Sequence, residues 1–156
     1  MKMMLAVALA GCLALAANQK RETAMHTATG TFDVKMLPPS APPVPGDFVR
    51  LSLDKTFQGD LQGTSKVEML ASNGGDQASG GYVALERFTG TLQGKSGSFV
   101  MQHSGTMSPG AMDIKVLVSP GSGTGELAGI DGSLEIRKEG KQHFFTLKYT
   151  LPAAAK

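Results

Sequence analysis

From residue 26 onward the sequence alternates apolar and polar side chains with a period of two, the pattern of β-strands that have one solvated face. The segment 28–36 shows this clearly, because its apolar residues Phe32, Val34 and Met36 are separated by polar ones. No segment has apolar residues that recur every 3.6 positions, so no helix is expected. The alternation predicts strands over 28–36, 49–58, 64–71, 81–91, 95–105, 111–118, 132–138 and 143–151.

A repeated motif marks two of the strand connections. The pattern Phe57-x-Gly59-x-Leu61-Gln62-Gly63-x-Ser65 recurs as Phe88-x-Gly90-x-Leu92-Gln93-Gly94-x-Ser96, with a shorter echo over 125–129. Glycines allow a tight reversal of the chain, and the central leucine can plug the end of a barrel. Eight strands are the number at which a barrel closes around side chains or one small ligand. The sequence therefore predicts an all-β fold, a small closed antiparallel β-barrel of about eight strands.

The first 24 residues have the composition of a secretory signal segment. Lys2 precedes an apolar run over 3–15 that is too short to span a bilayer, and small residues at 14 and 16 suit a signal peptidase. This interpretation predicts an exported protein, periplasmic or secreted, with its barrel domain over 25–151 and a short tail over 152–156. Two alternatives stay open. Cys12 ends a lipobox-like sequence and could carry a lipid anchor, or Met25 is the true start and the protein is cytoplasmic.

Composition and charge exclude several classes of function. Residues 25–156 hold 12 basic and 12 acidic side chains, and a neutral domain lacks the charge that drives nucleic-acid binding. The lone cysteine lies in the leader, so no internal disulfide forms. The three histidines, His26, His103 and His143, are too dispersed in the sequence to form a metal motif. We therefore expect neither a metal nor a cofactor.

Three residues are candidates for catalysis. Tyr82 and Glu86 share a strand face with the apolar Phe88, which would carry them into the barrel. A carboxylate in an apolar interior has a raised pKa and can act as a general acid or base. His103 shares its face with Phe99 and is either a catalytic group or a structural residue of the core whose hydrogen bonds are satisfied. For Glu86 the structural alternatives are exposure to solvent and a buried pair with a lysine.

The apolar strand faces supply candidate ligand-binding residues. Glu68 is included with less support, because it lies opposite the apolar side of its strand unless the preceding bend reverses the alternation. The predicted ligand-binding residues are Phe57, Phe88, Phe99, Met101, Glu68 and Tyr149.

Several stretches resemble a bacterial family of unknown function, domain-of-unknown-function family 3224. They lie over 25–32, 55–66, 81–86, 97–106 and 121–132, and together they span nearly all of the predicted domain. The resemblance implies a barrel similar to that of allene oxide cyclase and of dirigent proteins, which commonly assemble into oligomers. It does not transmit a reaction, because unrelated functions share folds. The leader departs from the family pattern, since similar sequences begin near Met25.

Three functions remain open at this point. The first is binding of a small apolar molecule, such as a lipid-derived acid, inside the barrel. The second is a cofactor-free isomerase or cyclase of the allene oxide cyclase type, in which Glu86, Tyr82 or His103 steers charge. The third is a structural envelope protein or the subunit of a homo-oligomer, which works through its outer surface.

Overall fold

The computed structural model describes residues 24–39, 48–73 and 79–152. The predicted signal segment, the alternative lipid anchor at Cys12 and the end of the C-terminal tail lie outside these residues. Within them, no helix is long and apolar enough to cross a membrane.

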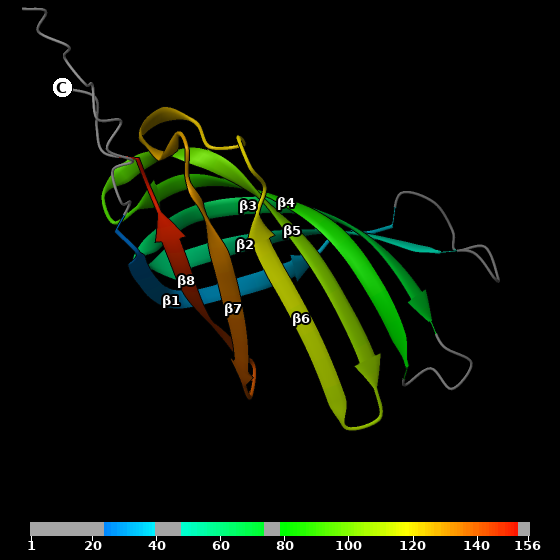
Figure 1. Cartoon of the computed structure of the whole chain (residues 1–156). Coiled ribbons are helices and arrows are strands. Elements are labelled where there is room, and N and C mark those ends of the chain that lie inside the picture. The colour runs from blue at the N-terminus through cyan, green and yellow to red at the C-terminus, as the bar shows by residue number, and fades with distance from the viewer. Residues whose placement is uncertain (1–23, 40–47, 74–78, 153–156) are drawn as a thin grey trace, which may run out of the picture.

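Eight antiparallel strands form a closed barrel, in which each strand pairs with the next and β8 returns to β1 (Figure 1). The predicted all-β barrel is therefore confirmed. The strands are β1 (His26–Met36), β2 (Val49–Gly59), β3 (Leu61–Asn73), β4 (Gly80–Leu92), β5 (Lys95–Ser108), β6 (Ala111–Val118), β7 (Asp131–Glu139) and β8 (Gln142–Thr150).

The repeated Gly-x-Leu motif closes one end of the barrel. Leu61 at the start of β3 pairs with Leu92 at the end of β4, and both side chains are completely inaccessible to solvent. Next to them Gly63 pairs with Gly90, so that the two motifs lie antiparallel against each other. The third leucine, Leu127, is equally buried in η1 (Gly125–Leu127), a single 3-10 turn that was not expected from the sequence.

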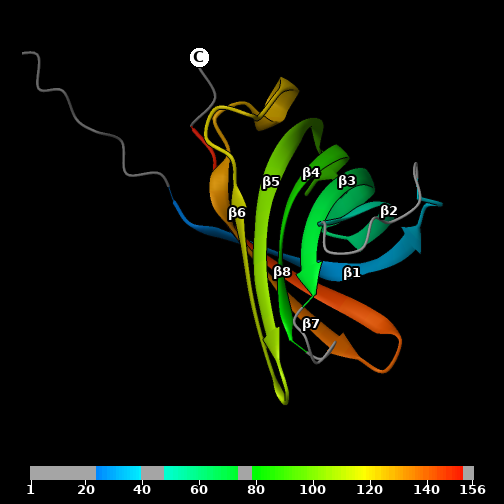
Figure 2. The same ribbon diagram turned by 90° about the vertical axis from the view of Figure 1, so that its right-hand side faces the viewer.

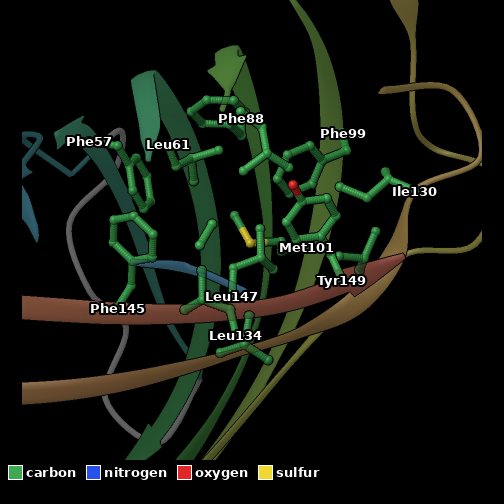
Figure 3. Packing of buried hydrophobic residues seen from close by; sticks show 14 of the residues in the cluster. Phe57, Leu61, Phe88, Phe99, Met101, Ile130, Leu134, Phe145, Leu147 and Tyr149 are labelled. Atoms are coloured by element: carbon green, nitrogen blue, oxygen red, sulfur yellow. The ribbon is translucent and has the colours of Figure 1, made fainter. Parts of the chain in front are cut away.

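This closed end contains a packed aromatic core (Figure 3). Rings contact one another along the inside of the barrel: Phe57 lies 5.7 Å from Phe88 and 5.6 Å from Phe145, and Phe88 lies 5.2 Å from Phe99, between centroids. Aliphatic side chains from the other strands fill the spaces between the rings. This half of the barrel is therefore a solid core rather than a cavity.

The opposite end is open along one side. β6 and β7 are joined at one residue pair, Leu117 with Ser133, whereas the other neighbouring strands pair along most of their length. Figures 1 and 2 show the β5–β6 and β7–β8 hairpins pointing apart beyond this pair. The barrel is thus plugged by leucines at one end and divided by a seam between β6 and β7 at the other.

Gly90, where the two motifs pair, has no room for a side chain. A Cβ added at Gly90 would lie 2.1 Å from the carbonyl oxygen of Gln62, in backbone that the neighbouring strand holds in place. We expect Gly90→Ala to lower the free energy of unfolding by about 1–3 kcal/mol. Gly81→Ala is the matched control, because its nearest contact of 3.4 Å is ordinary packing and should change stability by less than about 0.5 kcal/mol. Urea denaturation followed by circular dichroism measures both, and equal midpoints for the two variants would contradict the packing argument.

Candidate functional site

A fully buried carboxylate lies at the centre of the barrel. Glu86 on β4 has no solvent-accessible surface. Its Oε2 is 2.6 Å from Lys55 Nζ on β2, and its Oε1 accepts a hydrogen bond of 2.5 Å from Ser65 Oγ on β3. His103 on β5 places Nε2 2.8 Å from the same Oε2. Four adjacent strands therefore each contribute one polar side chain to a single cluster, which we call the Glu86 cluster.

The alternation and register of the strands bring these side chains together. Lys55 pairs with Ser65 across β2 and β3, so the two side chains share the inner face. On β4, Glu86 lies two positions from Phe88, which is buried in the aromatic core. His103 pairs with Ala84 and is therefore a diagonal neighbour of Glu86 across β4 and β5.

His103 contacts the carboxylate electrostatically rather than through a well-aligned hydrogen bond. Nε2 and Lys55 Nζ converge on one oxygen, and the ring nitrogen lacks good hydrogen-bond geometry although it is buried. His103 retains 7% of its surface exposed, so its ring lies on the accessible side of the Glu86 cluster.

The electrostatics of Glu86 differ from the sequence-based expectation. Burial raises the pKa of this carboxyl, but the contact with His103 and the charge of Lys55 outweigh burial and lower the pKa to about 2. The expected raised pKa is thus wrong, whereas the alternative of a buried pair with a lysine agrees with the contact between Glu86 and Lys55. Glu86 is ionised at neutral pH and is better suited to holding Lys55 and His103 in position than to donating a proton.

Tyr82 lies on the open side of the cluster. Its ring occupies the space that a side chain at position 105 would need, since a Cβ on Gly105 would lie 2.2 Å from Tyr82 Cε1. Burial and the charge of Glu86 raise the pKa of Tyr82, so the phenol stays neutral and can donate a hydrogen bond.

Beyond the Glu86 cluster the inner face of the barrel is apolar and incompletely covered. Val34 and Met36 continue the inward-facing side of β1 after Phe32, yet they are 40% and 53% exposed. The inward residues Met69, Ile114 and Ile136 are only partly buried. The Glu86 cluster therefore lies at the boundary between a solid core and an open, apolar-lined half, which we call the open half.

A second histidine lies at the same boundary. His143 on β8 stacks on Phe32, with 5.0 Å between ring centroids, and Lys55 Nζ lies 4.9 Å from the centroid of that ring. Burial, followed by the charges of Lys138 and Lys55, lowers the pKa of His143 and so favours its neutral form. The histidine thus adds a polar group to an edge of the open half that already carries two lysines.

The structure separates the predicted site residues into three groups. Glu86, His103 and Tyr82 come together on one inner surface. The aromatic and methionine candidates, and Tyr149, whose hydroxyl donates to Gln93 Oε1 at 2.7 Å, lie in the closed half. Glu68 faces outward and accepts a hydrogen bond of 2.8 Å from Ser52 Oγ, as its position in the alternation favoured. The candidates of the closed half that contact other core residues are Phe57, Phe88, Phe99, Met101 and Tyr149.

Sequence reasoning missed Lys55 and Ser65 as parts of the site. A signal for Lys55 existed, because it occupies an inward position between Leu53 and Phe57 on β2. A lysine on an apolar strand face requires a counter-charge, and Glu86 was the inward carboxylate available. Ser65 had no such signal, since serine is common on strands. Among the described residues, no group of three or more His, Cys, Asp or Glu side chains is arranged to hold a metal ion.

Comparisons with known proteins agree with this fold. The model of a family of proteins of unknown function, DUF3224, matches residues 28–149. A crystal structure of a DUF3224 protein of unknown function from Shewanella oneidensis MR-1 is similar at a TM-score of 0.75 and 42% sequence identity. The match covers 83% of this chain and 100% of that one. No curated protein matches the chain. The expected likeness to allene oxide cyclase stays a prediction.

The depressed pKa of Glu86 makes stability depend on pH. The folded value of about 2 is below the ordinary 4.5, so ionised Glu86 stabilises the fold fully above about pH 4.5. This contribution, about 3 kcal/mol, is lost as the pH falls from about 5 to 2. A ¹³C NMR titration of the carboxyl should give a midpoint well below 4, and a midpoint above 4.5 would contradict the assignment.

A pair of variants separates Glu86 from the other carboxylates. Glu86→Gln leaves Lys55 buried without its counter-charge and should cost about 3–5 kcal/mol at neutral pH. The stability of this variant should also depend less on pH between 5 and 2. Glu135→Gln, which removes an exposed pair with Lys148, should cost less than about 1 kcal/mol and keep the wild-type pH dependence.

Proposed function

The chain belongs to the DUF3224 family, and we propose that it binds a small apolar carboxylic acid in the open half of its barrel. One observation carries the proposal: a buried ionic cluster, whose Lys55 and His103 keep slight exposure, lies where a solid core gives way to exposed apolar inner residues. A few convergent polar groups at the base of an apolar cavity are the usual arrangement of a small-molecule site. We call the space between the apolar inner residues of the open half the cup.

The exposed inner residues favour an apolar ligand. Val34, Met36 and Ile136 point toward the barrel axis but have no protein side chains that cover them completely. Covering apolar surface yields roughly 25 cal/mol for each Å² removed from water. An alkyl or ring system would gain that energy here without displacing the core.

The charges at the base favour an acidic head group. Lys55 has three N–H donors, one of which binds Glu86, and it retains 7% of its surface exposed. Lys138 and His143 lie at the same edge and are close enough for the lysine's charge to act on the histidine. Glu86 neutralises Lys55 in the empty site. A ligand carboxylate would accept a hydrogen bond from one of the N–H donors of Lys55 that Glu86 leaves unused.

The seam between β6 and β7 supports access to the cup. Beyond Leu117 and Ser133, no ladder of backbone hydrogen bonds between these two strands has to break when they separate. Each backbone hydrogen bond contributes a net free energy of about 0.5–1.5 kcal/mol, so the seam is the least costly place to widen the barrel. A ligand longer than the mouth can therefore extend sideways into the seam.

Isothermal titration calorimetry with saturated fatty acids tests the proposal. Acids of roughly 8 to 12 carbons are suitable, because molecules of this size fit a small-molecule site. We expect Met36→Arg to weaken binding of decanoic acid at least about tenfold, because it places a charge in the cup. Leu85→Arg, an equally exposed residue on the outside of β4, is the matched control and should bind as the wild type does. Lys55→Met should remove the preference for decanoic acid over decanol. Absence of binding to the wild type, or equal binding to both arginine variants, would contradict the proposal.

The contact between Glu86 and His103 favours a second candidate, proton transfer within a bound unsaturated acid. Nε2 of His103 faces the carboxylate, which leaves Nδ1 as the nitrogen available to a ligand. Nδ1 would take a proton from an activated C–H, the electron pair would shift along the double bonds, and Nδ1, after exchanging its proton with water, would return a proton at another carbon. The reaction is an isomerisation and needs no oxidant or cofactor.

Solvent exchange tests this second candidate. An unsaturated acid incubated with the protein in D2O should incorporate deuterium, detected by mass spectrometry. His103→Asn should abolish incorporation while retaining most of the binding measured by calorimetry. Binding without any incorporation by the wild type would leave the protein as a binding barrel alone.

A further inference from the structure

Exposed apolar side chains gather on the outer face of the barrel, on the side opposite to the cup. Strands β2 to β6 form this face, and Figure 2 shows β3, β4 and β5 side by side in it. Val83 and Leu85 at its centre are each 57% exposed, and Leu70 and Leu117 flank them at 37% and 40%. Grouped apolar residues of this kind on a soluble protein mark an interaction surface.

The strand register arranges the outward residues of this face in two rows that cross the five strands. The first row is Ser52, Glu68, Leu85, Gln102 and Leu117. The second row is Arg50, Leu70, Val83, Ser104 and Lys115. All ten residues line one hollow of about 660 Å³. The face is therefore a shallow apolar surface with charged ends.

The two rows are complementary to each other. A two-fold axis that lies between them, parallel to the rows, would place each row of one copy on the other row of a second copy. Leu85 would then meet Val83 of the second copy, at the apolar centre. The longer Gln102 would meet the shorter Ser104, whose hydroxyl can hydrogen-bond to the amide. Glu68 would meet Leu70 and Lys115 would meet Leu117, so the aliphatic parts of these charged side chains would cover the two leucines on either side of the centre.

The charges follow the same symmetry. Arg50 of one copy would lie over Ser52 of the other, next to Glu68, which is the neighbour of Ser52 across β2 and β3. Arg50 takes part in no ion pair with the described part of its own chain, so its charge is available to Glu68 of the second copy. With equal numbers of acidic and basic side chains in residues 25–156, two copies also carry little net charge to repel each other.

We infer that this face is the interface of a symmetric homodimer, with Val83 and Leu85 at its centre and two Arg50–Glu68 pairs at its β2 end. Contacts in which the same patch of both subunits is self-complementary are the commonest form of homodimer interface. The apolar centre with charged ends has the core-and-rim composition of protein interfaces. The open half of the barrel stays accessible in this dimer, so the inference does not depend on the proposed ligand.

Sedimentation equilibrium of the full chain tests the interface. Concentrations from about 1 to 200 μM bracket ordinary dimer affinities. We expect a concentration-dependent dimer for the wild type. Leu85→Arg should raise the dissociation constant at least about 100-fold, because it brings like charges into the apolar centre. Met36→Arg, an exposed apolar residue of the cup, is the matched control and should dimerise as the wild type does. Circular dichroism and thermal unfolding confirm that each variant is folded.

A charge exchange provides an independent test that leaves the apolar centre of the interface unchanged. Glu68→Arg should weaken the dimer by placing two arginines together, and adding Arg50→Glu in the same chain should restore much of the affinity. A wild type that is monomeric at every concentration would overturn the inference, even if the face then binds a detergent or a peptide. A dimer that survives Leu85→Arg would overturn it too, because association would then use another surface.

Discussion

A buried carboxylate that must stay ionised is the constraint on which the inside of this barrel depends. Glu86 has no contact with water, and an unpaired charge there would cost several kcal/mol. Lys55, Ser65 and His103 compensate for that cost from three neighbouring strands. Each donor is correctly placed only if β2, β3, β4 and β5 keep their register. The cluster therefore ties the register of half of the barrel to a single side chain.

The position of the Glu86 cluster also divides the barrel into two parts. On one side the rings of the aromatic core and the buried leucines of the repeated motif leave no room for a ligand. On the other side the apolar inner residues remain partly exposed, and β6 separates from β7. The Glu86 cluster between these halves provides polar groups at the base of the open half. The same arrangement explains why His103 keeps some exposure while Glu86 has none.

Much of the fold could be predicted from the sequence, whereas only part of the site could. Period-two alternation located all eight strands, because the apolar residues of each strand recur on its inner face. It also placed Glu86, His103 and Tyr82 on inner faces. Strand β3 begins at Leu61, three residues earlier than the sequence predicted. The prediction missed this start because the strand pairing continues through Gly63, where the glycines had indicated a turn. The predicted direction of the pKa shift of Glu86 was wrong because the shift depends on Lys55 from another strand. Only the register of the strands determines the distance between these two side chains.

The most direct measurement of the central claim is a crystal structure of the full chain grown with decanoic acid. We expect the carboxylate within hydrogen-bond distance of Lys55 Nζ and the alkyl chain between Met36 and Ile136, in a barrel whose aromatic core is unchanged. An acid bound on the outer face of β2 to β6, or a Lys55 that contacts only Glu86 beside an empty cup, would contradict it.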